Sequence, residues 1–87
     1  VILSGEMFQE SKPNPEIYTE TMKCLRVEPE RCIVLEDSDY GICAAKSAGA
    51  HVIAHREDRF GFTQEMADHV VRDMYHAKEM IRTKFNL

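Results

Sequence analysis

The sequence has no excess of basic residues. Its 11 Lys and Arg side chains are outnumbered by 15 Asp and Glu side chains, and the formal net charge is -4. There is no basic run with interleaved aromatic residues, the pattern of many nucleic-acid-binding segments. No apolar stretch approaches the roughly 20 residues of a membrane-spanning helix. We therefore expect neither nucleic acid nor a membrane as the partner of this chain.

Cysteine and glycine motifs are also scarce. The three cysteines form no CxxC pair, which is typical of reduced thiols in a cytoplasmic protein, and we expect all three to be buried as small hydrophobic residues. No G-x-G-x-x-G follows an apolar run, so a dinucleotide-binding fingerprint is excluded. The length of 87 residues allows one domain at most. Because Val1 opens an apolar run rather than a Met-led segment, we expect a piece of a longer chain.

Apolar runs alternate with helical segments along the chain. We expect strands at residues 1–3, 32–35, 51–54 and 70–71. Helices are expected after Asn14 with inward Tyr18, Met22 and Leu25, then over the alanine-rich segment before Gly49, over residues 63–68, and after Asp73. Strands alternating with helices predict an α/β fold in which helices flank a parallel, Rossmann-like sheet.

An acidic segment, Glu36-Asp37-Ser38-Asp39, directly follows the apolar run at residues 32–35. In an open parallel sheet, ligands bind outside the carboxyl ends of the strands. Mg²⁺ prefers oxygen ligands and usually takes one or two carboxylates, so Asp37 and Glu36 are metal-site candidates. Acidic residues and serine before a helix also serve as caps, and this alternative stays open for the whole segment.

Lys12 stands in the segment E-S-K-P-N-P-E-I-Y, just before an expected helix. Pro13 disfavours the α-helical conformation at Lys12, and Pro15 does the same at Asn14. The backbone is therefore stiff and extended around the ammonium group. That arrangement suits a charge held beside an anion such as a phosphoryl group, although a lone loop lysine is more often simply solvated.

The two segments S-K-P-N-P-E-I-Y and L-E-D-S-D-Y-G-I-C-A-A-K-S-A-G-A together resemble the haloacid dehalogenase superfamily. More narrowly, they are similar to its β-phosphoglucomutase-like phosphatases. The resemblance covers about residues 1–71. It implies a Mg²⁺-dependent phosphatase or phosphomutase acting on a small phosphorylated metabolite.

The resemblance implies a role for each matching residue. Lys12 corresponds to the lysine that neutralises the phosphoryl group and the nucleophile. Asp37 corresponds to the Mg²⁺ ligand, and Glu36 to its neighbour, which supports the metal directly or through water. Ser38 and Asn14 are expected close to the phosphate and the metal. We expect Lys12 and Asp37 to share one cleft, roughly 4–8 Å apart, as stabilisation of a transferring charged group requires.

Only part of the family pattern is present. The D-x-D-G-T segment that carries the nucleophile is missing, and so are the second motif and the cap domain. Residues 1–87 therefore resemble the C-terminal part of the catalytic core domain, and the chain alone is expected to be inactive. The alternative is a non-catalytic α/β fragment or interaction module whose acidic loop only caps a helix.

The family's strand order makes a further prediction. There the nucleophile strand lies beside the strand that corresponds to residues 32–35. The second-motif strand comes next, and the strand that corresponds to residues 1–3 lies beyond it. Without the two central strands, the edge of residues 32–35 should expose unpaired backbone groups. We expect that edge to pair with the missing N-terminal half or with another chain.

Overall fold

Four parallel strands form one sheet in the computed structural model, which describes residues 1–5, 16–58, 61 and 63–84. The strands lie in the order β1-β2-β3-β4, and every neighbouring pair is parallel. Their bounds are β1 Ile2–Ser4, β2 Ile33–Glu36, β3 His51–His55 and β4 His69–Val71. The predicted α/β class with a parallel sheet is confirmed.

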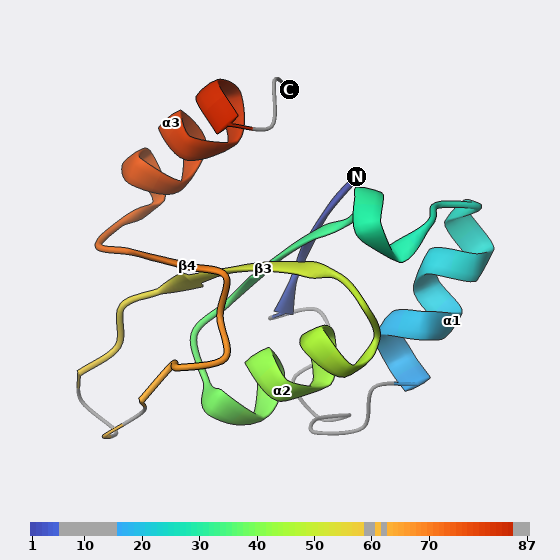
Figure 1. Ribbon diagram of the computed structural model, residues 1–87, viewed down its shortest axis with the longest axis horizontal. Coiled ribbons are helices and arrows are strands. Elements are labelled where there is room, and N and C mark those ends of the chain that lie inside the picture. The colour runs from blue at the N-terminus through green and yellow to red at the C-terminus, as the bar shows by residue number, and fades with distance from the viewer. Residues whose placement is uncertain (6–15, 59–60, 62, 85–87) are drawn as a thin grey trace.

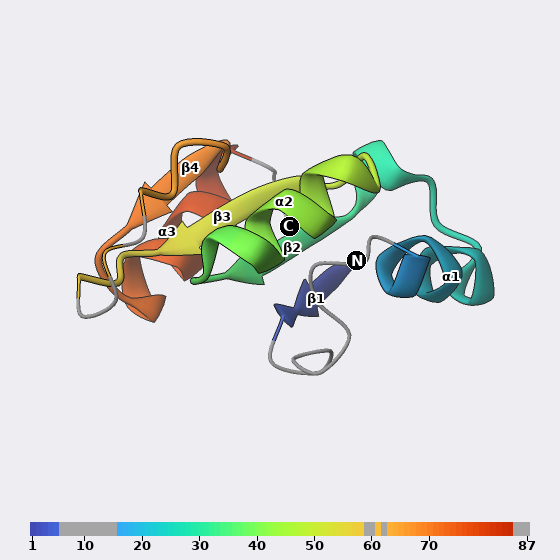
Figure 2. The same ribbon diagram turned by 90° about the horizontal axis from the view of Figure 1, so that it is seen from below.

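Helices cover both faces of this sheet. They are α1 (Glu16–Leu25), α2 (Asp39–Ser47) and α3 (Met74–Lys84), with a short 3-10 turn, η2 (Pro29–Arg31), before β2. Figure 1 shows α2 and α3 on opposite sides of β3, and Figure 2 shows α1 and α3 at opposite ends of the molecule. None of the helices in the described part of the chain is long and apolar enough to cross a membrane.

The core consists of two apolar clusters, one on each face of the sheet. Side chains alternate along β2, so that Val34 joins one cluster and Ile33 the other. The cluster beneath α1 and α2 contains Leu3, Tyr18, Met22, Cys32, Val34, Ile42, Ala44, Ala45, Ala50, Val52 and Ala54. The cluster beneath α3 contains Ile33, Ile53, Val71, Ala77 and Ile81. β2 is therefore buried on both faces, as is typical of a strand inside a parallel sheet.

Three local expectations are wrong. Residues 63–68 form turns rather than a helix, because Gln64 has a left-handed φ of 56° and its backbone is held by a distant side chain described below. Leu25 ends α1 and is exposed instead of facing the core. Cys24 is exposed as well, whereas Cys32 is buried and Cys43 half-buried.

The edge of β2 does not stand open. β1 pairs with it directly, with Ile2 opposite Ile33 and Ser4 opposite Leu35. The prediction of unpaired backbone groups along β2 is therefore wrong for this chain. β1 pairs with β2 because unpaired backbone donors and acceptors are costly, and β1 is the strand available to pair with them.

Candidate functional site

The acidic segment lies at the carboxyl edge of the sheet. β2 ends at Glu36, and the chain continues through Asp37 and Ser38 into α2. Because all four strands are parallel, the ends of β1 at Ser4 and of β3 at His55 lie at the same edge. This is the edge at which open parallel sheets bind ligands.

Glu36 is buried, with only 5% of its surface exposed. The Tyr18 hydroxyl donates to Glu36 Oε2 at 2.7 Å, and the backbone N–H of Asp37 donates to Glu36 Oε1 at 3.1 Å. Burial is the largest cause that raises the pKa of the Tyr18 phenol, followed by its hydrogen bond to Glu36. Tyr18 therefore remains protonated and donates to a carboxylate that could otherwise not be buried.

Two glycines make room for this carboxylate. A Cβ atom at Gly5 or at Gly41 would overlap the Glu36 carboxylate. Gly5 follows β1, and Gly41 lies in the first turn of α2. The start of α2 can approach the end of β2 only because Gly41 has no side chain.

Asp37, the next residue, is exposed, in contrast to the buried Glu36. Ser38 is the N-cap of α2, and its Oγ accepts a hydrogen bond from Gly41 N at 3.1 Å. Asp39 accepts hydrogen bonds from the backbone N–H groups of Thr63 and Gln64. Within this segment, Ser38 has the structural role of a cap, Asp39 joins two loops, and Asp37 offers an exposed carboxylate.

The donor set fits Mg²⁺. Asp37 supplies one exposed carboxylate, and the preceding residue, Glu36, supplies a buried one whose oxygens already accept two hydrogen bonds. Mg²⁺ usually keeps several waters and takes one or two protein carboxylates, so a larger cage is not required. Among the described residues, no group of three or more His, Cys, Asp and Glu side chains could hold a metal ion.

Lys12 and Asn14 lie outside the described residues, and so does the predicted distance between Lys12 and Asp37. Two other residues at this edge carried no sequence assignment to the site. Tyr18 is the last residue of the segment S-K-P-N-P-E-I-Y, and its helical spacing predicted only a core position. No local sequence pattern could have assigned Gln64 to the site, because its side chain contacts residues that are 9 and 27 positions away.

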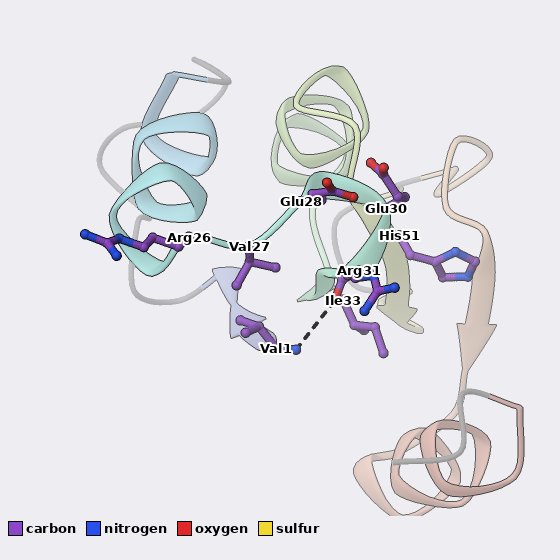
Figure 3. A pocket seen from close by; sticks show the side chains of 8 residues that line it. All are labelled: Val1, Arg26, Val27, Glu28, Glu30, Arg31, Ile33 and His51. Atoms are coloured by element: carbon purple, nitrogen blue, oxygen red, sulfur yellow. Dashed lines mark hydrogen bonds between the residues drawn. The ribbon is translucent and has the colours of Figure 1, made fainter.

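One cavity near the strands lies away from this edge. It has a volume of about 720 Å³ and is lined by Val1, Arg26, Val27, Glu28, Glu30, Arg31, Ile33 and His51 (Figure 3). Val1, Ile33 and His51 lie where β1, β2 and β3 begin, so the cavity opens at the amino edge of the sheet. It is therefore separate from the acidic segment.

Fold and site together define a class of protein. It is an α/β protein with a parallel sheet and an exposed carboxylate in the loop after a central strand. Comparison with known families then identifies the family. The sequence model described as haloacid dehalogenase-like hydrolase matches residues 1–55. The chain belongs to this family, as the two linked motifs predicted.

Individual relatives support the same assignment. The chain is 49% identical over 53 residues to Protein CbbY of Cereibacter sphaeroides, a match that covers 61% of this chain and 23% of that protein. It is 47% identical over 49 residues to the phosphorylated carbohydrates phosphatase of Thermotoga maritima, covering 56% of this chain and 23% of that protein. The chain thus matches about a quarter of the length of these curated relatives.

A solved structure shows the same fold. The β-phosphoglucomutase of Clostridium difficile superposes with a TM-score of 0.64 at 27% sequence identity. The superposition covers 88% of this chain and 35% of that protein. Over most of its length, the chain therefore shares its fold with part of this protein.

Proposed function

We propose that the complete enzyme containing this chain is a Mg²⁺-dependent phosphatase or phosphomutase that acts on a small phosphorylated metabolite, such as a sugar phosphate. The observation that carries this proposal is the exposed Asp37 at the carboxyl edge of the sheet, next in sequence to the buried Glu36. Family membership and the names of two relatives, a phosphorylated carbohydrates phosphatase and a β-phosphoglucomutase, support the same chemistry.

This chain would supply the charged surroundings of the reaction. Asp37 and Glu36 would hold Mg²⁺, which when bound offsets negative charge on the transferring phosphoryl group. Lys12, which precedes α1 in the sequence, would offset charge on the same group. Ser38 would keep the start of α2 capped, so that the loop with Asp37 keeps its shape.

The covalent step needs a residue from outside this chain. An aspartate of the D-x-D-G-T segment would attack phosphorus, forming an aspartyl-phosphate while the bond to the substrate oxygen breaks. Water, or a second substrate hydroxyl in a mutase, would then receive the phosphoryl group. No aspartate of this chain is followed by x-D-G-T, so we expect the 87-residue chain alone to hydrolyse no phosphate ester.

The test uses the complete enzyme, prepared free of metal and titrated with Mg²⁺. Asp37→Asn should lower turnover by roughly 10²-fold, because it removes a preorganised charge. Glu36→Gln should weaken the dependence on Mg²⁺. The matched control is Asp58→Asn, whose side chain is 86% exposed in the loop after β3. Wild-type turnover in the Asp37→Asn enzyme would contradict the proposed function.

A further inference from the structure

The loop that carries Asp37 is attached to a second loop, the one between β3 and β4. Asp39 Oδ2 accepts a hydrogen bond from Thr63 N at 3.1 Å, and Asp39 Oδ1 accepts one from Gln64 N at 2.8 Å. Both carboxylate oxygens of one side chain thus hold two successive backbone N–H groups. The start of α2 is in this way fixed to residues that are 24 and 25 positions away in the sequence.

The Gln64 side chain completes the connection in the opposite direction. Its Nε2 donates to the backbone carbonyl oxygens of Asp37 and His55, each at 2.7 Å. Its Oε1 accepts a hydrogen bond from Arg56 Nη1 at 3.3 Å. One amide group therefore joins the ends of β2 and β3, and one of its two acceptors is the backbone of the candidate metal ligand.

Gln64 is unusual in two respects. It is 1% exposed, although glutamine is mostly found at the protein surface. It also has a φ of 56°, in the left-handed region that non-glycine residues rarely adopt. Backbone strain of this kind persists only where the surrounding contacts determine it, and such residues cluster at functional sites. The hydrogen bonds from Asp39 and to Asp37 and His55 are those contacts.

We propose that Gln64 is a positioning residue that holds the backbone at Asp37, so that the Asp37 carboxylate is presented to Mg²⁺ at a fixed place. This inference rests on the proposed function. Gln64 itself binds no substrate in this arrangement, because its amide group is buried and occupied by two carbonyl oxygens and Arg56. Asp39 serves the same purpose by fixing the backbone of Gln64.

The experiment compares two variants of the complete enzyme. Gln64→Met keeps the length of the side chain and removes both donors to Asp37 and His55. Ile81→Val, in the apolar cluster beneath α3 on the other face of the sheet, is the matched control for a general loss of stability. Two quantities are measured without substrate: the Mg²⁺ dissociation constant by calorimetry, and hydrogen exchange of the Asp37 amide in the metal-free enzyme.

We expect Gln64→Met to raise the Mg²⁺ dissociation constant roughly tenfold, the lower end of the range for residues that orient metal ligands. The Asp37 amide, which donates to Glu36, should exchange faster than in the wild type. Ile81→Val should change neither quantity, even if it lowers the melting temperature as much as Gln64→Met does. Wild-type Mg²⁺ affinity or wild-type exchange at Asp37 in Gln64→Met would overturn this inference and leave the proposed function standing. Failure of the wild-type enzyme to bind Mg²⁺ would overturn both.

Discussion

The Tyr18 hydroxyl donates a 2.7 Å hydrogen bond to the buried carboxylate of Glu36, which links the first turn of α1 to the end of β2. Tyr18 is fully buried and Glu36 is nearly so. A charged acceptor in such a place must be hydrogen-bonded, since an unpaired buried carboxylate is costly. The Tyr18–Glu36 hydrogen bond therefore stabilises the core and also holds the first residue of the acidic segment in place.

Tyr18→Phe should lower the free energy of unfolding by about 1–3 kcal/mol, because it removes the hydroxyl and leaves a buried charged acceptor short of one donor. Urea denaturation followed by circular dichroism measures this difference. The same change at Tyr40, which is 69% exposed, is the matched control and should stay within about 0.5 kcal/mol of the wild type. Equal losses of unfolding free energy in the two variants would show that the Tyr18–Glu36 hydrogen bond does not stabilise the fold.

Gly41→Ala tests the close approach of α2 to Glu36. In an ordinary helix, this substitution stabilises by about 1 kcal/mol. Here the added methyl group would overlap the Glu36 carboxylate, which is held by Tyr18 and has little room to move. We expect a net loss of roughly 1–3 kcal/mol, as in other overpacked cores.

Ser47→Ala, at the exposed end of the same helix, provides the comparison, since there the helix propensity of alanine should give a small gain. Thermal unfolding of both variants tests this, because the melting temperature should fall for Gly41→Ala and rise slightly for Ser47→Ala. A stabilised Gly41→Ala variant would contradict the packing described for Glu36.

Local patterns predicted β2 and α2 well. The apolar run at residues 32–35 and the alanine-rich segment before Gly49 fix their own secondary structure. Gly49 has the left-handed φ of 90° expected of a glycine after a helix, and its N–H bonds to the carbonyl of Lys46. These features depend on neighbours in sequence and can therefore be inferred from it.

Features set by distant partners could not be inferred. Glu36 and Asp37 are adjacent and chemically alike, yet one is buried and the other exposed, because the partner of Glu36 lies 18 residues upstream. Residues 63–68 have helical composition, but Asp39 holds the backbone of Gln64 in a conformation that no helix contains. Tertiary contacts override local propensity at both places.

Asp68 gives the chain a pH-dependent contribution to stability. Its carboxylate accepts hydrogen bonds from Val52 N at 2.7 Å and from Lys46 Nζ at 2.9 Å, and His51 Nδ1 lies 3.9 Å from it. Burial acts to raise the pKa of Asp68, but these donors outweigh it and hold the pKa below its usual value. Burial also lowers the pKa of His69, whose ring lies beside His51.

A depressed folded-state pKa of Asp68 stabilises the fold at pH values above the usual aspartate pKa of about 4, and this contribution is lost as the pH falls through the folded-state value. Asp68→Asn should therefore make the loss of stability between about pH 5 and pH 3 less steep. Lys46→Gln removes one donor and keeps Val52 N, so it should have a smaller effect. Urea titrations at several pH values measure the slope, and an unchanged slope in Asp68→Asn would refute this role.

Lys12→Ala tests the cationic half of the proposed site in the complete enzyme. If the Lys12 ammonium stabilises the charge on the transferring phosphoryl group, its removal should lower turnover by roughly 10²-fold. The fold should stay intact, which circular dichroism and the melting temperature would check. Lys23→Ala is the matched control, because Lys23 lies in α1 with a side chain 71% exposed and pairs with Glu20 at the surface. Steady-state kinetics with sugar phosphates should separate the two variants clearly, and normal turnover by Lys12→Ala on its best substrate would exclude Lys12 from the chemistry.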